Sequence, residues 1–487
     1  MLGKVARWFL AGSVGWFLVG SVCAGCSLQA SKQPAPVLPA AFEHTVPTDS
    51  ADWPSRDWYR NFASAELDAL IAEASANNFD LATARSRVTQ ADMRARQAHA
   101  GILPSVDAGG NGNYLAGHSV DGSAHETDWS ALGSASYEVD FWGKHRAAAD
   151  SARYLAIAAQ ADRDTIAITT LAAVADGYFQ VMALRERLAI AHSNVDAARS
   201  LMQIVETRYR AGSSNPVEVA TQRSTLATAE LAIPDLEQTE VEARAALAAL
   251  LGRSPEGFRL EGTPLEALKE PPVGAGLPSD LLRRRPDIFT AEANLTAASA
   301  DFRAARAALF PSLSLTAAGG VQNPALNAAV ISLSGVGPTL NLGASLMQPI
   351  LDGGRLRSAR AAAQAKEEEL GTSYRAAIVA ALVDVENTLS AIHRLDAARA
   401  FQIDNVTQSQ RMFEGARLRY EAGYGDFLTV LEAQRILYTQ RDLFCRYKLA
   451  RLQALVSLSK ALGGGWQASD TVAQAPAVAA QTANPRP

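Results

Sequence analysis

The sequence predicts an internally duplicated, mixed α/β membrane protein. In this fold four β-strands per chain contribute to a barrel shared between chains, and long α-helices continue it as a coiled-coil barrel. Three observations support the prediction. Two stretches spell nearly the same turn, "RYRAGSSNPVEVATQR" (208–223) and "RYEAGYGDFLTVLEAQR" (419–435). Two helical segments of 67 residues without proline precede these turns. Four further stretches alternate between apolar and polar residues with a period of two.

The N-terminal segment 1–25 is predicted to be a signal peptide. A positively charged start precedes an apolar stretch, Trp8–Val22, as is typical of secretory signals. The letters "CAGCS" follow, and the small residues before Cys26 resemble a bacterial lipobox, so Cys26 is the predicted lipidated first residue of the mature chain. Cys23 stands where such boxes usually carry Leu, and an ordinary cleaved signal is the alternative. Residues 26–62 are then a lipidated, Pro-rich tether.

Composition excludes several classes of function. The net charge of −5 gives no basic surface for nucleic acid. Outside "CAGC" only Cys445 remains, so no disulfide framework is possible, and a lone cysteine on a helix is expected to serve packing. The seven histidines show no metal-ligand spacing, and no nucleophile elbow or phosphate-binding loop is present. The sequence predicts no enzyme activity, no metal and no cofactor other than the lipid.

The chain is built as a tandem duplication. Residues 80–105 and 287–312 share nine identities at a constant offset of 207 residues. Each half contains a moderate helix, two alternating segments, a very long helix, a Gly-containing turn and a second helix, and this unit is far longer than a solenoid repeat. The predicted organisation is a first repeat, a Pro/Gly-rich equatorial connector, a second repeat and a mobile tail: 63–252, 253–279, 280–463 and 464–487.

The longest helices are expected over Lys144–Arg210 and Arg355–Glu421, each about 100 Å long. Apolar residues of the second follow a heptad seam: Ile378, Leu382, Val385, Leu389 and Ile392. Charges flank this seam, so the helices are predicted to form coiled coils in water and not membrane spans. Gly212 and Gly423 are the predicted helix stops. The duplicated turns are therefore expected to be two equivalent hairpin tips. The second helix of each pair is expected to end near residue 252 and residue 463.

The alternating segments are predicted strands at about 103–117, 128–142, 311–322 and 337–350. A half-buried soluble sheet would give the same alternation. Their length of about ten residues suits a tilted strand across a bilayer, and the polar stretches His118–Asp128 and Asn323–Gly337 are the expected loops. Four strands cannot close a water-filled barrel, and lipid tolerates no open edge. Three chains would supply twelve strands.

Several motifs make the chain resemble the TolC-type outer-membrane factor family, specifically its lipoprotein subgroup paired with tripartite RND-type multidrug efflux systems. The motifs are "GLPSDLLRRRPDI" (276–288), "LFPSLSL" (309–315), "QPILDGGRLRSAR" (348–360), 419–435 and "KALGGGW" (460–466). The resemblance implies a homotrimer with a twelve-stranded barrel in the Gram-negative outer membrane and an α-helical barrel in the periplasm. It also implies a passive exit duct for a periplasmic adaptor and an inner-membrane transporter. Ser27 and not Asp follows Cys26, and in bacterial lipoproteins this favours sorting to the outer membrane.

The resemblance places a periplasmic gate near the second tip, at Tyr420, Leu428, Glu432 and Arg435. The spacing of the last three puts them on one helix face. In a trimer that face would give stacked rings, an apolar ring that resists wetting and Glu–Arg links between chains. The alternative is an ordinary surface pair with Leu428 packed in the helix seam.

The two tips are the expected contacts for the adaptor: Gly212, Ser213, Asn215, Gly423, Tyr424, Gly425 and Asp426. Arg283–Arg285 are expected to cap and solvate a helix junction, and Asp140 and Asp352 to cap the helices that follow them. Three other functions stay open. They are a coiled-coil structural lipoprotein without a pore, an exit duct for a metal or secretion system, and a secreted lipoprotein enzyme.

Overall fold

A computed structural model describes residues 39, 41–44, 53–119, 122–271, 274, 276, 278–323 and 337–467. The chain divides into two units, Met1–Val37 and Leu38–Pro487, and everything below concerns the second. The predicted signal peptide and Cys26 therefore lie outside the described residues.

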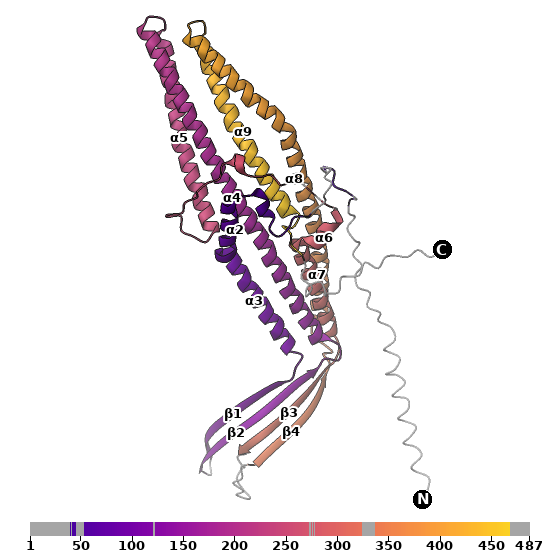
Figure 1. The fold of residues 1–487 in the computed structure, drawn as a ribbon. Coiled ribbons are helices and arrows are strands. Elements are labelled where there is room, and N and C mark those ends of the chain that lie inside the picture. The colour runs from indigo at the N-terminus through magenta and orange to yellow at the C-terminus, as the bar shows by residue number, and fades with distance from the viewer. Residues whose placement is uncertain are drawn as a thin grey trace, which may run out of the picture. The chain divides into compact units, whose positions relative to one another are not determined.

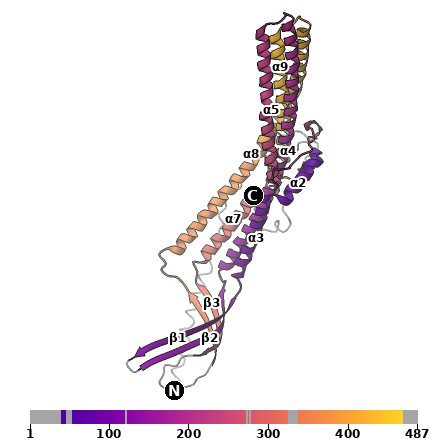
Figure 2. The ribbon, with the colours of Figure 1, turned by 90° about the vertical axis from the view of Figure 1, so that its left-hand side faces the viewer.

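Two long hairpins of helices dominate this unit. The first joins α4 (Lys144–Arg210) to α5 (Pro216–Leu250), and the second joins α8 (Arg355–Glu421) to α9 (Phe427–Ala461). Both long helices have the predicted bounds. The hairpins end in neighbouring turns at one end of the unit, and the strands lie at the other end (Figures 1 and 2).

Shorter helices complete each repeat. Helix α4 is central, because it packs against α2, α3, α5, α7 and α9, whereas α8 packs against α7 and α9. The remaining helical elements are η1 (Trp58–Phe62), α2 (Ala65–Asn77), α3 (Phe79–Ala100), η2 (Leu265–Ala267), η3 (Pro278–Asp280), α6 (Leu281–Arg284) and α7 (Pro286–Ala307).

An aspartate carboxylate caps the start of each long helix, as predicted. Asp140 accepts hydrogen bonds from the backbone N–H groups of His145 and Arg146. Asp352 does the same for Gly354 and Leu356. Each carboxylate satisfies amide groups that a helix start leaves without partners. The junction between strand and long helix is therefore built in the same way in both repeats.

The four strands form one antiparallel sheet in the order β1-β2-β3-β4. The strands are β1 (Ser105–Ser119), β2 (Gly122–Val139), β3 (Ser312–Asn323) and β4 (Gly337–Met347). Pairing of β2 with β3, with Val139 opposite Leu313, joins the two repeats. Among the described residues, β1 and β4 are edge strands.

The predicted loop His118–Asp128 is wrong. His118 pairs with Ser123 and Asn113 with Asp128, so both strands continue through the polar stretch and only 120–121 separate them. Strand pairing uses backbone groups, and polar side chains do not prevent it. The second predicted loop falls on 324–336, which lie outside the described residues.

Among the described residues, the apolar face of the sheet is exposed on both edge strands. Val106 on β1 is 78% exposed and Leu342 on β4 is 77% exposed. A half-buried soluble sheet would cover this face with its own helices or a second sheet. The exposed face therefore favours the membrane alternative.

The predicted heptad seam is confirmed. Ile378, Val385, Leu389 and Ile392 are buried in the main core, and Leu382 packs against it. Both long helices contain an 18-residue window apolar enough to cross a membrane, with mean hydropathy 1.4 in α4 and 1.3 in α8. Half of the α4 window and 28% of the α8 window are already buried inside the chain. Part of this apolar character belongs to side chains that pack against neighbouring helices: the seam residues in α8, and Val174, Tyr178 and Val181 in α4.

The expected tether and tail both contribute to the core. Trp58 and Phe62, assigned to a tether ending at residue 62, are buried. Gly464 and Gly465, assigned to a mobile tail, are buried as well, and the Trp466 indole N–H donates to Asp164 (2.9 Å). The predicted bounds of the tether and the tail therefore include residues that belong to the core, because these contacts join segments that are distant in sequence.

A glycine triplet allows this C-terminal packing. A Cβ on Gly463 would lie 1.9 Å from the Arg284 carbonyl oxygen, and one on Gly465 would lie 2.2 Å from the Ser55 carbonyl carbon. A Cβ on Gly464 would touch Ile168 of α4 at 3.0 Å. The turn after α9 therefore lies against three separate segments of the chain, and we call Gly463–Trp466 the C-terminal clamp.

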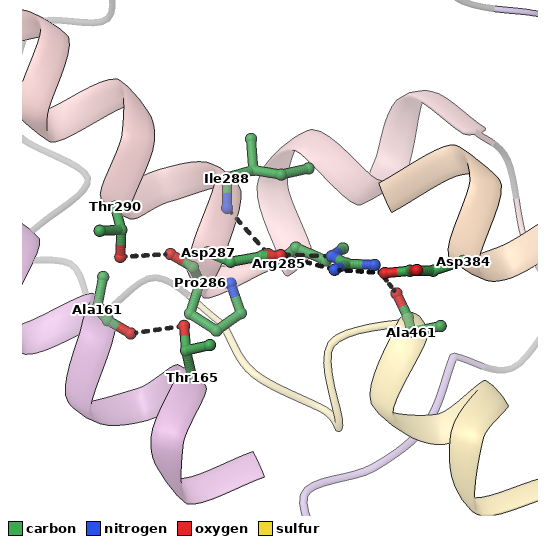
Figure 3. Close-up of polar contacts among 9 residues, drawn as sticks. All are labelled: Ala161, Thr165, Arg285, Pro286, Asp287, Ile288, Thr290, Asp384 and Ala461. Atoms are coloured by element: carbon green, nitrogen blue, oxygen red, sulfur yellow. Dashed lines mark hydrogen bonds and ion pairs between the residues drawn. The ribbon is translucent and has the colours of Figure 1, made fainter. Parts of the chain in front are cut away.

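Arg285 is buried, although the sequence suggested a solvated junction. Its guanidinium lies between Asp287 and Asp384, with N–O distances of 2.6 and 3.2 Å, and it donates to the Ala461 carbonyl oxygen at 3.1 Å (Figure 3). Burial by itself lowers the Arg285 pKa. The hydrogen bonds and negative charges of Asp287 and Asp384 outweigh this effect, so the pKa is raised overall. Arg285 thereby links the start of α7 to α8 and to the end of α9.

Candidate functional site: the helix-hairpin tips

The two tips have the same backbone geometry. Gly212 and Gly423 adopt φ of 73° and 84°, a left-handed conformation that suits glycine. The N–H of Ser213 bonds to the Arg208 carbonyl oxygen, and the N–H of the equivalent Tyr424 bonds to that of Arg419. Both glycines are confirmed as helix stops.

At each tip a side chain caps the N-terminus of the helix that follows. Asn215 accepts from the Glu218 N–H (3.0 Å), and Asp426 accepts from the Thr429 N–H (3.2 Å). Gly425 packs closely, because a Cβ there would lie 2.7 Å from the Tyr420 nitrogen. The other predicted tip residues, Gly212, Ser213, Asn215, Gly423, Tyr424 and Asp426, are exposed.

The exposed tips also carry apolar side chains. Tyr424 is 84% exposed at the second tip, and Val217 is exposed beside the first. Single exposed apolar side chains are common on protein surfaces, and a contiguous patch is what marks a binding site. The tips thus present exposed backbone turns with Tyr424 and Val217 beside them.

Tyr420 lies between the two hairpins, in a small core that is separate from the main one. Its side chain is 2% exposed and contacts the Phe427 ring. The same core contains Leu201 and Val205 of α4 and Val430 of α9. Tyr420 therefore belongs to the contact between hairpins and does not face solvent with the other predicted gate residues.

Polar contacts join Tyr420 to the first hairpin. Its hydroxyl donates to a Glu218 carboxylate oxygen (3.0 Å), and its carbonyl accepts from Arg208 (2.5 Å), whose guanidinium stacks 4.5 Å from the ring centroid. Burial and the neighbouring Glu218 raise the Tyr420 pKa to about 12. The phenol therefore stays a hydrogen-bond donor throughout the physiological range. We call Arg208, Glu218 and Tyr420 the tip latch.

Leu428, Glu432 and Arg435 share one exposed face of α9, as their spacing predicts. Leu428 is 63% exposed, so it does not pack in the helix seam. Glu432 and Arg435 form two hydrogen bonds within the chain, of 2.8 and 2.5 Å. This pairing lowers the pKa of Glu432 and raises that of Arg435. Within the described chain Glu432 and Arg435 therefore form a local ion pair. A Glu–Arg pair between chains would form only if this local pair were broken.

Sequence analysis missed Arg208 and Glu218. Arg208 belongs to the duplicated "RY" pair, at the position equivalent to Arg419. Comparing Tyr420 with its counterpart in the first repeat would have brought Arg208 into view. Glu218 has Thr429 as its counterpart, so nothing in the repeat identifies it. Its contact with Tyr420 spans 202 residues of sequence.

Comparison with known proteins agrees with the duplicated fold. The family profile described as "Outer membrane efflux protein" matches residues 70–253 and 277–464, nearly the two predicted repeats. The chain is 44% identical over 421 residues to the pyoverdine export outer membrane protein OpmQ of Pseudomonas aeruginosa, covering 85% of this chain and 88% of that protein. It is 29% identical over 458 residues to the cation efflux system protein CusC of Escherichia coli, covering 93% and 98%.

Solved structures show the same fold. The outer-membrane channel OprN superposes with a TM-score of 0.83 at 25% identity, covering 91% of this chain and all of that one. The open state of the Neisseria gonorrhoeae MtrE outer membrane channel superposes with a TM-score of 0.78 at 27% identity, covering 90% and 97%.

Proposed function

Because the chain belongs to the outer membrane efflux protein family, we propose that it is the passive exit duct of a tripartite efflux pump. The observation that carries this proposal is the placement of two structures at opposite ends of one unit (Figure 1). At one end is an antiparallel sheet with an exposed apolar face, and at the other are twin hairpin tips that can dock a partner.

A homotrimer follows from the sheet. The strands β1 and β4 are edges within the described chain, and their backbone groups need partners in lipid. Three copies joined edge to edge give a closed barrel of twelve strands, wide enough for a lumen. The helix hairpins of three chains then continue the duct into the periplasm. A lipid on Cys26 adds an anchor in the same membrane.

The tips supply the docking surface for a periplasmic adaptor, which connects the duct to an inner-membrane transporter. The tip latch holds the two hairpins of one chain together while the duct is closed. The face carrying Leu428, Glu432 and Arg435 narrows the same end. An adaptor that binds splayed tips more tightly than closed ones shifts the population toward the open duct. The duct itself moves molecules without covalent chemistry or ATP.

The proposed cargo is pyoverdine or a molecule of the same class. Identity to the pyoverdine exporter OpmQ is 44%, against 29% to CusC and to the toluene efflux protein TtgC of Pseudomonas putida. A duct for cations or solvents is the second candidate, since those relatives also match over nearly the whole chain.

Two experiments test the proposal. The purified protein is expected to migrate as a detergent-resistant trimer that dissociates on heating, and to form channels in planar bilayers. A coiled-coil lipoprotein without a pore would show neither property. For cargo, expression of the chain in a strain lacking its pyoverdine duct is expected to restore secretion into the medium. Restored toluene or cation tolerance without pyoverdine secretion would favour the second candidate.

A further inference from the structure

A short N-terminal segment is fixed against the middle of α8. Phe42 is buried in the main core and anchors residues 41–44. The backbone N–H groups of Glu43 and His44 donate to the two carboxylate oxygens of Glu386, each at 3.2 Å. The His44 imidazole also contacts this carboxylate, with Nδ1 2.5 Å from Oε1. We call residues 41–44 the strap.

Two further side chains converge on this contact. The ligand atoms of Glu43, His44 and Glu386 all lie within 4.8 Å of one another. His393 follows Glu386 by two helical turns on the same face of α8, and its ring centroid lies 6.2 Å from that of His44. We infer that these four side chains form a binding site for a divalent transition metal, with Zn²⁺ as its representative: Glu43, His44, Glu386 and His393.

The distances among Glu43, His44 and Glu386 suit such an ion after small movements, and His393 joins them by turning its ring toward His44. With Zn–N and Zn–O bonds of about 2.0–2.1 Å, ligand atoms on a tetrahedral ion lie about 3.3 Å apart, and two bound imidazole centroids about 5 Å apart. The His44–Glu386 contact would open by less than about 1 Å. His393 is exposed, and among the described residues its ring makes no hydrogen bond, so it can turn toward His44 without breaking one.

The donor set also selects the class of ion. Two imidazoles and two carboxylates suit Zn²⁺ and its first-row neighbours, whereas Mg²⁺ and Ca²⁺ prefer oxygen ligands alone. The backbone N–H groups that donate to Glu386 orient the carboxylate, as outer contacts do in metal sites. The bound ion would fix the strap to α8, the same helix that carries Tyr420 at its far end.

The simpler explanation is a hydrogen-bonded pair between His44 and Glu386. Such a pair accounts for the 2.5 Å contact but needs neither Glu43 nor His393. Exchanging either of these two side chains therefore separates the explanations. Both are exposed, and the exchange removes no hydrogen bond that their side chains make among the described residues, so the protein is expected to fold normally.

The test uses the full-length protein in detergent, freed of any histidine tag and treated with a chelator that is then removed. Isothermal titration with ZnCl₂ is expected to give one tight site per chain. His393→Gln and Glu43→Gln are each expected to weaken this site by about tenfold or more. His192→Gln is the matched control, because His192 is an exposed histidine on α4. Titration with Co²⁺ is expected to give the strong visible absorption of a tetrahedral complex.

Loss of the site in His393→Gln and Glu43→Gln, with retention in His192→Gln, would support the inference. Equal binding by all variants would mean that Zn²⁺ binds elsewhere, and absence of a tight site in the unaltered protein would leave only the His44–Glu386 pair. Either result overturns the inference. Neither bears on channel activity, so the proposed duct is tested independently.

Discussion

Exchanging Tyr420 for Phe removes the hydrogen bond between Tyr420 and Glu218 from the tip latch without emptying its core. The ring, which is 2% exposed and packs on Phe427, is retained, and only the hydroxyl that donates to Glu218 is lost. A hydrogen bond to a charged group contributes about 1.5–3 kcal/mol. Ser214 and Asn215 still donate to Glu218 in the variant, so the lower value applies.

Three chains open together in the proposed trimer, so the closed state loses about 4.5 kcal/mol in total. A shift of about 5.5 kcal/mol is enough to move an equilibrium from 1:99 to 99:1. At about 1.4 kcal/mol per factor of ten, the open-to-closed ratio rises on the order of a thousandfold. A channel that is open about 1% of the time would become open most of the time.

Single-channel recording in planar bilayers measures this directly. Tyr420→Phe is expected to raise the open probability, with unchanged conductance of the open level. Tyr424→Phe is the matched control, because Tyr424 lies in the same turn and is 84% exposed. An open probability equal to that of the unaltered protein, from folded trimers, would refute the role of the latch. A rise in the control as well would point to a general loosening of the tip.

Three further predictions concern other parts of the chain. Exchange of both Glu432 and Arg435 for Ala is expected to raise the conductance of the closed duct in bilayer recording, and an unchanged conductance would mean that they form only a local pair. Gly463→Ala places a Cβ 1.9 Å from a backbone oxygen and is expected to lower the thermal midpoint much more than Gly257→Ala, whose Cβ meets nothing within 4 Å. Burial raises the Asp176 pKa to about 7, so the folded state retains a proton that the unfolded state loses near pH 4, and stability falls as pH rises between these values. Asp176→Asn is therefore expected to be more stable than the unaltered protein at pH 8, by about 1–4 kcal/mol, and no more stable below about pH 4; equal thermal midpoints at pH 8 would contradict this.

Local patterns predicted the fold well. The bounds of α4 and α8 follow from proline-free helical stretches that end at Gly212 and Gly423, and the seam at Ile378–Ile392 follows from its spacing. Each of these features depends on residues within a few turns of one another. A period in the sequence expresses such neighbours directly.

Most of the errors have a different cause. The Arg285 cluster, the burial of Trp58 and the tip latch all join residues that are far apart in the chain, and no local period encodes such contacts. The polar stretch 118–128 misled for another reason, because composition suggested a loop where backbone pairing continues. Tyr420 lies at the tip as expected, but its contacts with Arg208 and Glu218 were not predicted, and the gate at Tyr420, Leu428, Glu432 and Arg435 stays a prediction.

The C-terminal clamp has a consequence for how the protein is made. A secreted chain emerges N-terminus first, yet Gly463, Gly464 and Gly465 close against Arg284, Ile168 and Ser55, which arrive much earlier. The central region therefore cannot be completed until nearly the last described residues have crossed the inner membrane. A truncated chain would expose the surfaces left bare at Ile168 and Ser55 to periplasmic chaperones and proteases. The order in which the chain is made thus leaves the closing contacts of the central region to the residues that follow α9.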